Sequence, residues 1–287
     1  MGIRNWAMLA LAVALVAAQP ALAEKAPLEL APFSPWHVEW TKETCVVRSG
    51  YGTKEEPVIL QIERFAPHTG FAVVVVGKPF AKFAPGKVTI RYGPAGAIDE
   101  HEDVLDGTSG SGLPVLFFHT SSVGPRNGIG EFIPVSPDQE KAVTSIAISK
   151  RGKPTVILKT GRLDKMFAEM RKCTDDLVRS WKLDPEKLLR AQRGPIPVTD
   201  SRHWIKASDY PYNMLRAGKR SLINFVLLVD AAGNVSDCRI QRSYGDEAFV
   251  RRTCQALSQR AKFEPALDEK GQPIPSFFAT GVRWMIG

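Results

Sequence analysis

One stretch near the end of the chain stands out in the pattern of apolar and polar positions. Residues 222–229 are almost continuously apolar and rich in β-branched and aromatic side chains, and the run is too short for a lone helix. Residues 230–233 follow with the composition of a tight turn, in which glycine readily adopts positive φ. The pattern predicts a strand over residues 220–229, the turn, and a second strand over residues 234–243.

The next segment has the apolar spacing of a helix. The residues that recur at three- and four-residue steps are Phe249, Val250, Thr253, Leu257 and Ala261. Asp246 can cap this helix, because its carboxylate can accept hydrogen bonds from backbone N–H groups of the first turn. We predict a helix over residues 246–261, ended by residues 263–266, and a last strand over residues 276–285.

Four short motifs in this part of the chain resemble those of the C-terminal domain of TonB-type proteins. They are Tyr210-Pro211, Asp230-x-x-Gly233-x-Val235, Ser243-x-Gly245 and Phe263-x-Pro265-Ala266. The resemblance covers the last quarter of the chain, and its motifs are fairly specific as a set. It implies a small α/β domain with an antiparallel sheet and a periplasmic role linked to transmembrane transport, in contact with outer-membrane transporters.

The resemblance also implies a partner-binding site. In TonB-type domains the last strand pairs with an extended peptide of the receptor, because an open sheet edge offers unpaired N–H and C=O groups. The matching residues here are Phe278, Thr280, Val282 and Trp284 on the last strand, with Tyr210 and Pro211 beside the groove. The alternative is that Val282 and Trp284 belong to the core and that Tyr210-Pro211 only begins the domain.

The first half of the chain has the pattern of a mostly β domain. The candidate strands are residues 38–48, 58–65, 71–76, 87–92, 114–119, 144–149 and 155–159, with turn residues between them. Short strands at this spacing predict a sandwich or a barrel. Residues 71–76 are continuously apolar, so we expect them to form a central strand.

One long helix is expected after this sheet. Its apolar stripe consists of Leu163, Met166, Phe167, Met170, Cys173, Leu177 and Trp181. Such a stripe indicates core packing against the sheet rather than a ligand groove. Asp184-Pro185 then has the sequence of a helix start. A front half of this kind resembles those of alphaproteobacterial TonB-domain fusion proteins, and it implies no defined activity.

A short proline-containing segment separates the two halves. Pro195 and Pro197 interrupt regular structure, which indicates a hinge rather than a long spacer. We therefore expect an α+β protein with a signal peptide over residues 1–23 and a mostly β domain over residues 24–193. The linker is expected over residues 194–207 and the TonB-like domain over residues 208–287.

The N-terminal segment has the pattern of a secretory signal. A basic residue, Arg4, precedes an apolar core over residues 7–18, and an Ala-x-Ala motif stands before Glu24. The pattern predicts cleavage after Ala23 and a periplasmic location. The alternative is an uncleaved inner-membrane anchor that would make the protein an energy transducer, but the apolar core is short of the roughly 20 residues of a spanning helix.

Four cysteines in an exported chain indicate two disulfide bonds. Three pairings are possible. Pairing within domains, Cys45 with Cys173 and Cys238 with Cys254, is the simplest. A metal or redox site is the alternative, but the chain has no Cys-x-x-Cys motif and no paired histidine spacing.

The overall charge of the chain is basic. A net charge of +8 and a pI near 9.3 fit either attraction to acidic envelope polymers or ordinary solubility. The residues considered for a basic surface are Arg216, Lys219, Arg220, Arg239, Arg242, Arg251 and Arg252. No nucleic-acid fold signature accompanies them, so nucleic acid is not an expected partner.

No motif predicts catalytic residues. Residues 106–112 match neither a nucleophile elbow nor a phosphate loop, so we expect a flexible loop there. The nearby acidic stretch, Asp99, His101, Glu102, Asp103 and Asp106, could collect calcium or be a solvated loop. We predict a non-enzymatic protein without metal or cofactor. The alternative is an envelope enzyme with its site in the β domain.

Overall fold

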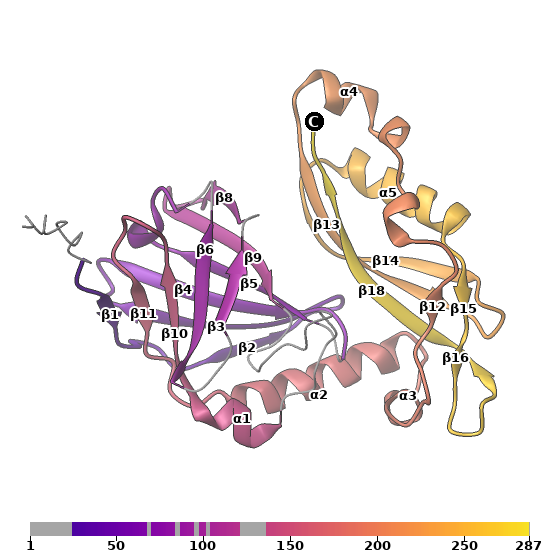
Figure 1. Ribbon diagram of the computed structural model, residues 1–287, viewed down its shortest axis with the longest axis horizontal. Helices are drawn as coiled ribbons and strands as arrows, with labels where there is room; N and C mark the ends of the chain where they lie inside the picture. Colours follow the sequence, from indigo (N-terminus) through magenta and orange to yellow (C-terminus); the bar gives the residue numbers. More distant parts are fainter. Residues whose placement is uncertain are drawn as a thin grey trace, which may run out of the picture.

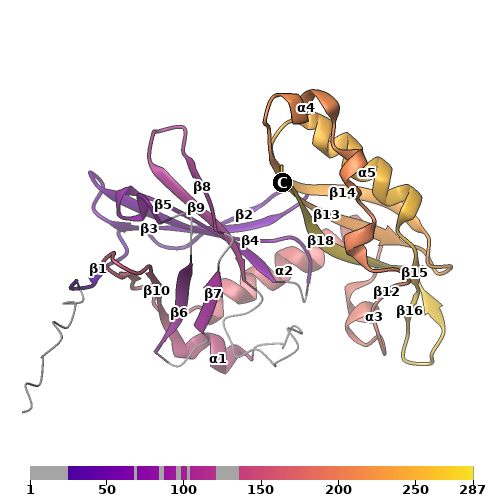
Figure 2. The same cartoon turned by 45° about the horizontal axis from the view of Figure 1, so that its top comes forward.

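The structure, a computed structural model, describes residues 25–67, 70–83, 87–94, 98–101, 104–120 and 136–286. We call residues 25–193 the front domain and residues 208–286 the C-terminal domain. Figures 1 and 2 show the two lying side by side, with the long helix α2 (Asp164–Ser180) running from the front domain toward the last strand, β18 (Ser276–Trp284). The architecture is α+β, as the sequence predicts.

The front domain contains two sheets that share one hydrophobic core. The six-stranded sheet has the order β2 (His37–Trp40), β3 (Cys45–Gly52), β4 (Pro57–Arg64), β5 (Phe71–Val76), β9 (Pro114–Thr120) and β8 (Leu105–Thr108). The five-stranded sheet has the order β1 (Leu28–Leu30), β11 (Val156–Leu158), β10 (Val143–Ser149), β6 (Val88–Pro94) and β7 (Ile98–His101). Only the β1–β11 pair of these sheets is parallel. The strand over 71–76 is central in its sheet, as predicted.

Several features of this domain differ from the sequence prediction. Strands β1 and β7 and the short helix α1 (Pro137–Ala142) were not predicted. The single strand expected over residues 38–48 is two strands, because Thr41 closes a turn in which its Oγ1 accepts a hydrogen bond from the Thr44 N–H at 2.9 Å. The loop expected over residues 106–112 contains strand β8, which pairs with β9, and a turn closed by the Ser109 N–H to the Leu113 carbonyl at 2.8 Å. The sequence of residues 106–112 predicted a loop instead of this strand, because it is rich in glycine and serine, which favour turns.

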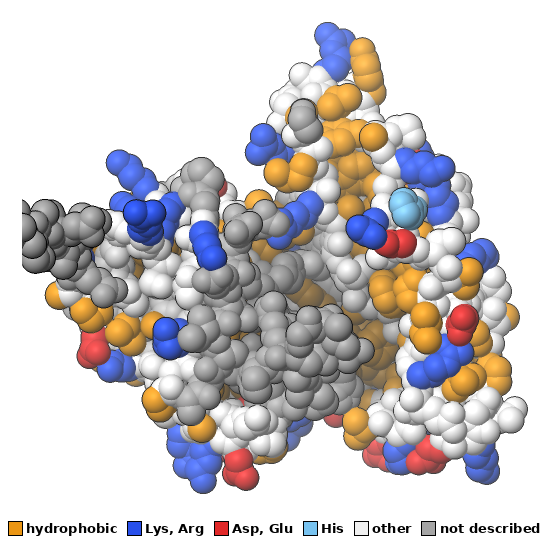
Figure 3. All heavy atoms as spheres, in the orientation of Figure 1, with side chains coloured by type: hydrophobic (Ala, Val, Ile, Leu, Met, Phe, Trp, Pro, Cys, Tyr) orange, Lys and Arg blue, Asp and Glu red, His pale blue; other side chains and the backbone are white. Residues whose placement is uncertain are grey.

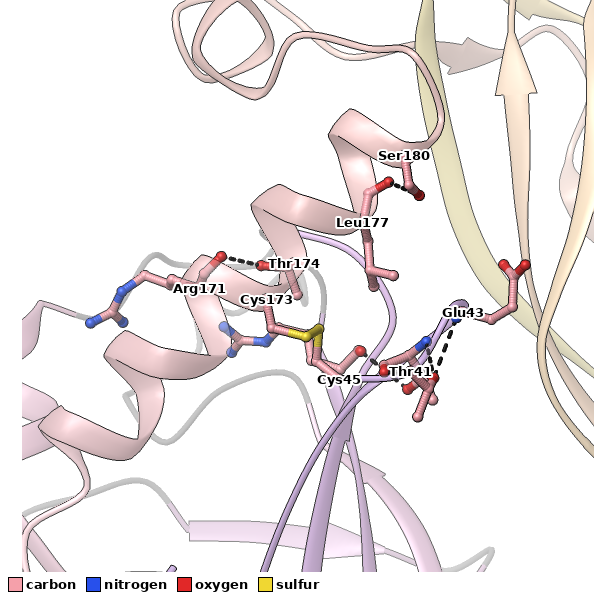
Figure 4. The surroundings of a disulfide bond; sticks show 10 residues. Thr41, Glu43, Cys45, Arg171, Cys173, Thr174, Leu177 and Ser180 are labelled. Carbon is pink, nitrogen blue, oxygen red and sulfur yellow. Dashed lines mark hydrogen bonds between the residues drawn. A yellow bond between two sulfur atoms is a disulfide. The ribbon is translucent and has the colours of Figure 1, made fainter. Parts of the chain in front are cut away.

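Helix α2 (Asp164–Ser180) packs with its predicted stripe buried, and the short helix α1 (Pro137–Ala142) precedes it. The disulfide Cys45–Cys173 joins α2 to the first residue of β3 (Figure 4). The second disulfide, Cys238–Cys254, lies within the C-terminal domain. The pairing within domains is therefore confirmed.

The C-terminal domain is a three-stranded antiparallel sheet with one helix on it. The sheet has the order β14 (Val235–Tyr244), β13 (Ser221–Val229) and β18 (Ser276–Trp284), and the helix is α5 (Glu247–Arg260). Asp246 caps α5 through its Oδ1, which accepts from the Ala248 N–H at 2.9 Å. The smaller elements are α3 (Pro185–Leu189), α4 (Tyr212–Arg216), and the strand pairs β12 (Ile196–Pro197) with β15 (Phe263–Glu264) and β16 (Ala266–Leu267) with β17 (Pro273–Ile274). None of the helices in the described part of the chain is long and apolar enough to cross a membrane.

Strand β13 is buried on both faces, which explains its continuous apolar sequence. Phe225 and Leu227 belong to the core that includes α5. Val226, pointing the opposite way, belongs to the core of the front domain. On the neighbouring strand β18, the Phe277 ring lies 5.4 Å from that of Trp181, at the end of α2. The front domain therefore covers the face of the sheet that α5 leaves open.

Two ion pairs cross the same interface. Glu63 on β4 is fully buried and accepts two hydrogen bonds from Arg242 on β14, at 2.9 and 3.0 Å. Glu43 accepts two from Arg239, at 2.6 and 3.2 Å. Arg239 and Arg242 were among the residues considered for a basic surface, but both guanidinium groups bind carboxylates of the front domain.

The proline-containing linker is fastened to the C-terminal domain. β12 pairs with β15, and the Gln192 N–H donates to the Leu267 carbonyl at 2.9 Å. Arg193, the last residue of the front domain before the linker, binds Glu264 through its guanidinium at 3.1 Å. The segment expected to act as a hinge is thus held by backbone pairing and a salt bridge.

Replacing Arg242 tests the interface. We expect Arg242→Ala to lower the free energy of unfolding by about 3 kcal/mol, because Glu63 would keep a buried charge without its partner. Denaturant unfolding followed by circular dichroism measures this loss, with Arg251→Ala on the exposed side of α5 as the control. Equal small losses in both variants would show that the Glu63–Arg242 pair does not hold the domains together.

Candidate functional site

A groove of about 390 Å³ lies beside the C-terminal half of β18. Its opposite wall is the segment that carries two short 3₁₀ helices, η2 (Ser201–His203) and η3 (Ala207–Asp209). The lining residues are Ser201, Arg202, Trp204, Ile205, Lys206, Ala207, Tyr210, Phe225, Leu257, Thr280, Gly281, Val282, Arg283, Trp284 and Met285. Figure 3 shows apolar side chains running along this side of the C-terminal domain, with lysine and arginine side chains around them.

Strand β18 forms one edge of its sheet. It pairs with β13 along its whole length, and among the described residues no strand pairs with its other side. Alternate residues of an antiparallel edge strand direct N–H and C=O groups away from the sheet. The groove therefore has a row of backbone donors and acceptors along one wall. The disulfide Cys238–Cys254 ties the opposite edge strand, β14, to α5 and leaves β18 uncovered.

Four of the six residues expected to bind a partner line this groove: Tyr210, Thr280, Val282 and Trp284. Thr280 is exposed and Val282 half-buried, whereas Trp284 is buried and its Nε1–H donates to Thr253 Oγ1 at 3.1 Å. The Tyr210 ring contacts that of Trp284 at 5.5 Å. Trp284 is thus both a core residue and part of the groove wall.

The other two expected residues lie elsewhere. Phe278 packs its ring against Trp204 at 5.6 Å and Phe263 at 5.2 Å, and it faces a different cavity. Pro211 precedes α4 and lies outside the groove lining. Phe278 thus contributes to the core beneath the Trp204 wall.

A buried carboxylate holds the wall of the groove in place. Asp209 accepts hydrogen bonds from Arg252 at 2.6 Å and from both terminal nitrogens of Arg260. The Lys206 backbone N–H donates to the same carboxylate at 2.7 Å. Arg260 also donates to the Trp204 carbonyl at 2.9 Å. The two arginines belong to α5, so they anchor residues 204–209 to the helix.

This network lowers the pKa of Asp209. The hydrogen bonds from Arg260 are the largest cause, and they outweigh the opposing effect of burial. The Lys206 N–H and the charges of both arginines lower the pKa further. The carboxylate is therefore ionised throughout the physiological range, and its negative charge stabilises the fold.

The sequence prediction missed Asp209 and Arg260, and it placed Arg252 on a free surface. Arg252 and Arg260 are two turns apart on a helix with a buried stripe, a spacing that puts both on one flank. Their partner is Asp209, the carboxylate directly before the Tyr210-Pro211 motif. Ion pairing between distant segments gives no periodic signal, so only the fold reveals it.

The groove lining is basic and lacks acid–base pairs. Arg202, Lys206 and Arg283 line it, and the lining residues include no aspartate, glutamate, histidine or cysteine. Arg202 is bound by Asp200, with its closest contact at 2.6 Å. All the fully charged side chains of the lining are therefore basic.

The acidic stretch considered for calcium is only partly described. Glu102 and Asp103 lie outside the described residues, and so do the side chains of Asp99 and His101. Asp106 lies on β8. Among the residues that the structure does describe, no group of three or more histidine, cysteine, aspartate or glutamate side chains is placed to hold a metal ion.

Comparison with known families agrees with the sequence motifs. Residues 206–285 match the family described as Gram-negative bacterial TonB protein C-terminal. This family is a non-enzymatic domain of energy transduction and interaction in the bacterial envelope. No curated protein and no solved structure matches the chain. The matched residues include the β18 edge and one end of the opposite wall, and the front domain lies outside the match.

Replacing Asp209 tests the anchoring of the groove wall. We expect Asp209→Asn to lower the free energy of unfolding by about 3 kcal/mol at pH 7, because two arginines lose their buried partner. A lowered carboxylate pKa stabilises the fold above the ordinary value of about 4 and loses that effect as pH falls. The difference from wild type should therefore narrow below pH 4.

Thermal unfolding by circular dichroism between pH 7 and pH 3 measures this dependence. Asp176→Asn, on the exposed side of α2, is the matched control. A stability difference that does not change over this range would mean that the charge of Asp209 contributes nothing.

Proposed function

We propose that this chain, whose residues 206–285 form a TonB C-terminal domain, is an exported, non-enzymatic binding protein. Its partner is the extended periplasmic segment of a TonB-dependent outer-membrane transporter or of another envelope protein. The role is linked to TonB-dependent transmembrane transport. The observation that carries the proposal is the open edge of β18 beside a preformed groove.

The mode of binding is strand addition. An incoming strand that pairs with β18 gains main-chain hydrogen bonds, and its alternate side chains can enter the groove. Thr280 and Val282 line that groove on β18, and Tyr210 lines it from outside the sheet. The main chain supplies affinity in this mode, and the groove supplies selectivity.

The charge of the groove favours a partner strand with acidic side chains. Lys206 and Arg283 lie in the lining and are exposed. Long basic side chains at the rim of an interface chiefly increase the association rate and select the partner. We therefore expect a partner segment with aspartate or glutamate next to its apolar residues.

Export of the chain is supported by its cysteines. All four form disulfide bonds, and structural disulfides form and persist in oxidising compartments such as the bacterial periplasm. Residues 1–23, which lie outside the described residues, are proposed as a cleaved signal peptide. The mature protein then consists of a front domain over residues 24–193, a linker over residues 194–207 and the TonB-type domain over residues 208–287.

Charge reversal in the groove tests the binding site. The probe is a labelled peptide copied from the periplasmic N-terminal segment of a TonB-dependent transporter, chosen to contain acidic residues. We expect Lys206→Glu to weaken its binding about tenfold, which corresponds to 1.4 kcal/mol. Fluorescence anisotropy measures the dissociation constant.

Lys270→Glu is the control, because Lys270 is an exposed lysine of the same domain outside the groove. It should leave the affinity for the peptide unchanged. Equal weakening by Lys206→Glu and Lys270→Glu would mean that only the net charge of the domain attracts the peptide, and the groove would lose its proposed role.

Intact mass tests the proposed export. We expect the native protein to be recovered from the periplasmic fraction with a mass that begins at Glu24. A membrane-bound species that retains residues 1–23 would contradict cleavage. The chain would then be a membrane-anchored transducer.

A further inference from the structure

A second cavity, of about 430 Å³, lies where the end of α2, the helix α3, the linker and the beginning of β18 meet. Residues 276–279 of β18 line this cavity, and the rest of the strand, from Thr280 to Trp284, lines the groove. The groove and the cavity share no lining residue. Together they follow β18 from its first residue to its last.

The cavity lies against the edge of β18 and not against one face of the sheet. Successive side chains of a strand point to opposite faces. Phe277 packs against the core of the front domain and Phe278 against the core that includes α5, yet both line the cavity. β13 occupies one side of β18, and among the described residues no strand pairs with the other side. The cavity therefore continues along the same unpaired edge as the groove.

One chain segment faces β18 along both the groove and the cavity. Residues 201–207 form the wall of the groove, and Ala191, Gly194 and Pro195 line the cavity. The rings of Trp204 and Phe278, 5.6 Å apart, mark the boundary, because Trp204 lines the groove and Phe278 lines the cavity. A partner strand that continues along β18 past this contact therefore leaves the groove and enters the cavity.

The cavity differs from the groove in its chemistry. Its charged lining residues are two acids and two bases, whose formal charges cancel: Asp175, Glu186, Arg179 and Arg193. The apolar lining includes Leu188 and Phe277, which are half-buried, and Leu189, which is 66 % exposed. Covering such surface with another apolar group is favourable, because it removes apolar area from water. The cavity thus fits a neutral apolar side chain, whereas the groove has a basic lining.

We propose that the front domain is part of the partner site, and that the partner strand bound to β18 places an apolar side chain in this cavity. The inference rests on the proposed strand addition to β18. It adds that α3 and the end of α2 help to select the partner, through an apolar residue beyond the acidic part of its strand. Phe278, which the family resemblance places in the partner site, contacts the partner from the cavity.

A substitution on α3 tests the contribution of the front domain. The protein is the chain over residues 24–287, and the probe is a labelled transporter-derived peptide long enough to pair with all nine residues of β18. We expect Leu189→Glu to weaken binding about fivefold, because a carboxylate at an apolar contact loses its hydration. Leu215→Glu, at an exposed leucine of α4 outside the groove and the cavity, should leave the affinity unchanged. Fluorescence anisotropy measures both dissociation constants.

Comparison with the groove variant Lys206→Glu separates this inference from the proposed function. Weaker binding in Lys206→Glu together with unchanged binding in Leu189→Glu would confine the partner to the groove and overturn the role of the front domain. Unchanged binding in both variants would contradict the use of the β18 edge altogether. Equal weakening by Leu189→Glu and Leu215→Glu would mean that net charge alone is responsible, which also overturns the inference.

A fluorescent label on α3 tests the same contact without adding charge. All four native cysteines form disulfide bonds, so Leu189→Cys introduces a single free thiol that can carry a bimane group. We expect the emission of the label to shift to shorter wavelength when the peptide binds, because the partner displaces water around it. The same label at Leu215→Cys should show no shift. Peptide binding without a shift at residue 189 would overturn the inference.

Discussion

The burial of β13 on both faces is the constraint on which the arrangement of the two domains depends. A three-stranded sheet with one helix covers only one face, and the other face of this sheet carries Val226 and Leu228. Leaving those side chains in water would forfeit roughly 1.5–3 kcal/mol for each one that is fully buried. The front domain supplies the missing layer through its own core and through Trp181 at the end of α2. With both faces covered, the edges of the sheet are the parts left for a partner strand.

Paired charges give this apolar contact a defined orientation. Glu63 on the front domain and Asp209 beside the groove are both fully buried carboxylates, and each is bound by arginine. A buried ion pair adds little net stability compared with apolar residues, but an unpaired buried charge is strongly destabilising. The first pair therefore disfavours other orientations of the two domains. The second holds residues 204–209 against α5, so the groove exists before a partner arrives.

The sequence allowed the C-terminal domain to be predicted well, because its elements carry local signals. Signals of this kind depend only on neighbouring residues. They are the apolar run of the strand that ends at Val229, the Asp246 cap, and the helical spacing up to Ala261. The strand β8 and the break at Thr41 were missed because glycine, serine and threonine favour turns as readily as edge strands. Four groove residues followed from the family resemblance, including Thr280 and Val282. Asp209 and its arginines were not found as a cluster, since their meeting depends on how distant segments fold together.

The central claim is that the open edge of β18 is the surface that receives a partner strand. Hydrogen–deuterium exchange of the full-length protein, measured with and without the transporter-derived peptide, tests it most directly. We predict slower exchange of amides in β18 and in the facing wall over residues 201–207, with no change in β14 at the other edge. Protection that appears on β14 or in the front domain, and not on β18, would contradict the account.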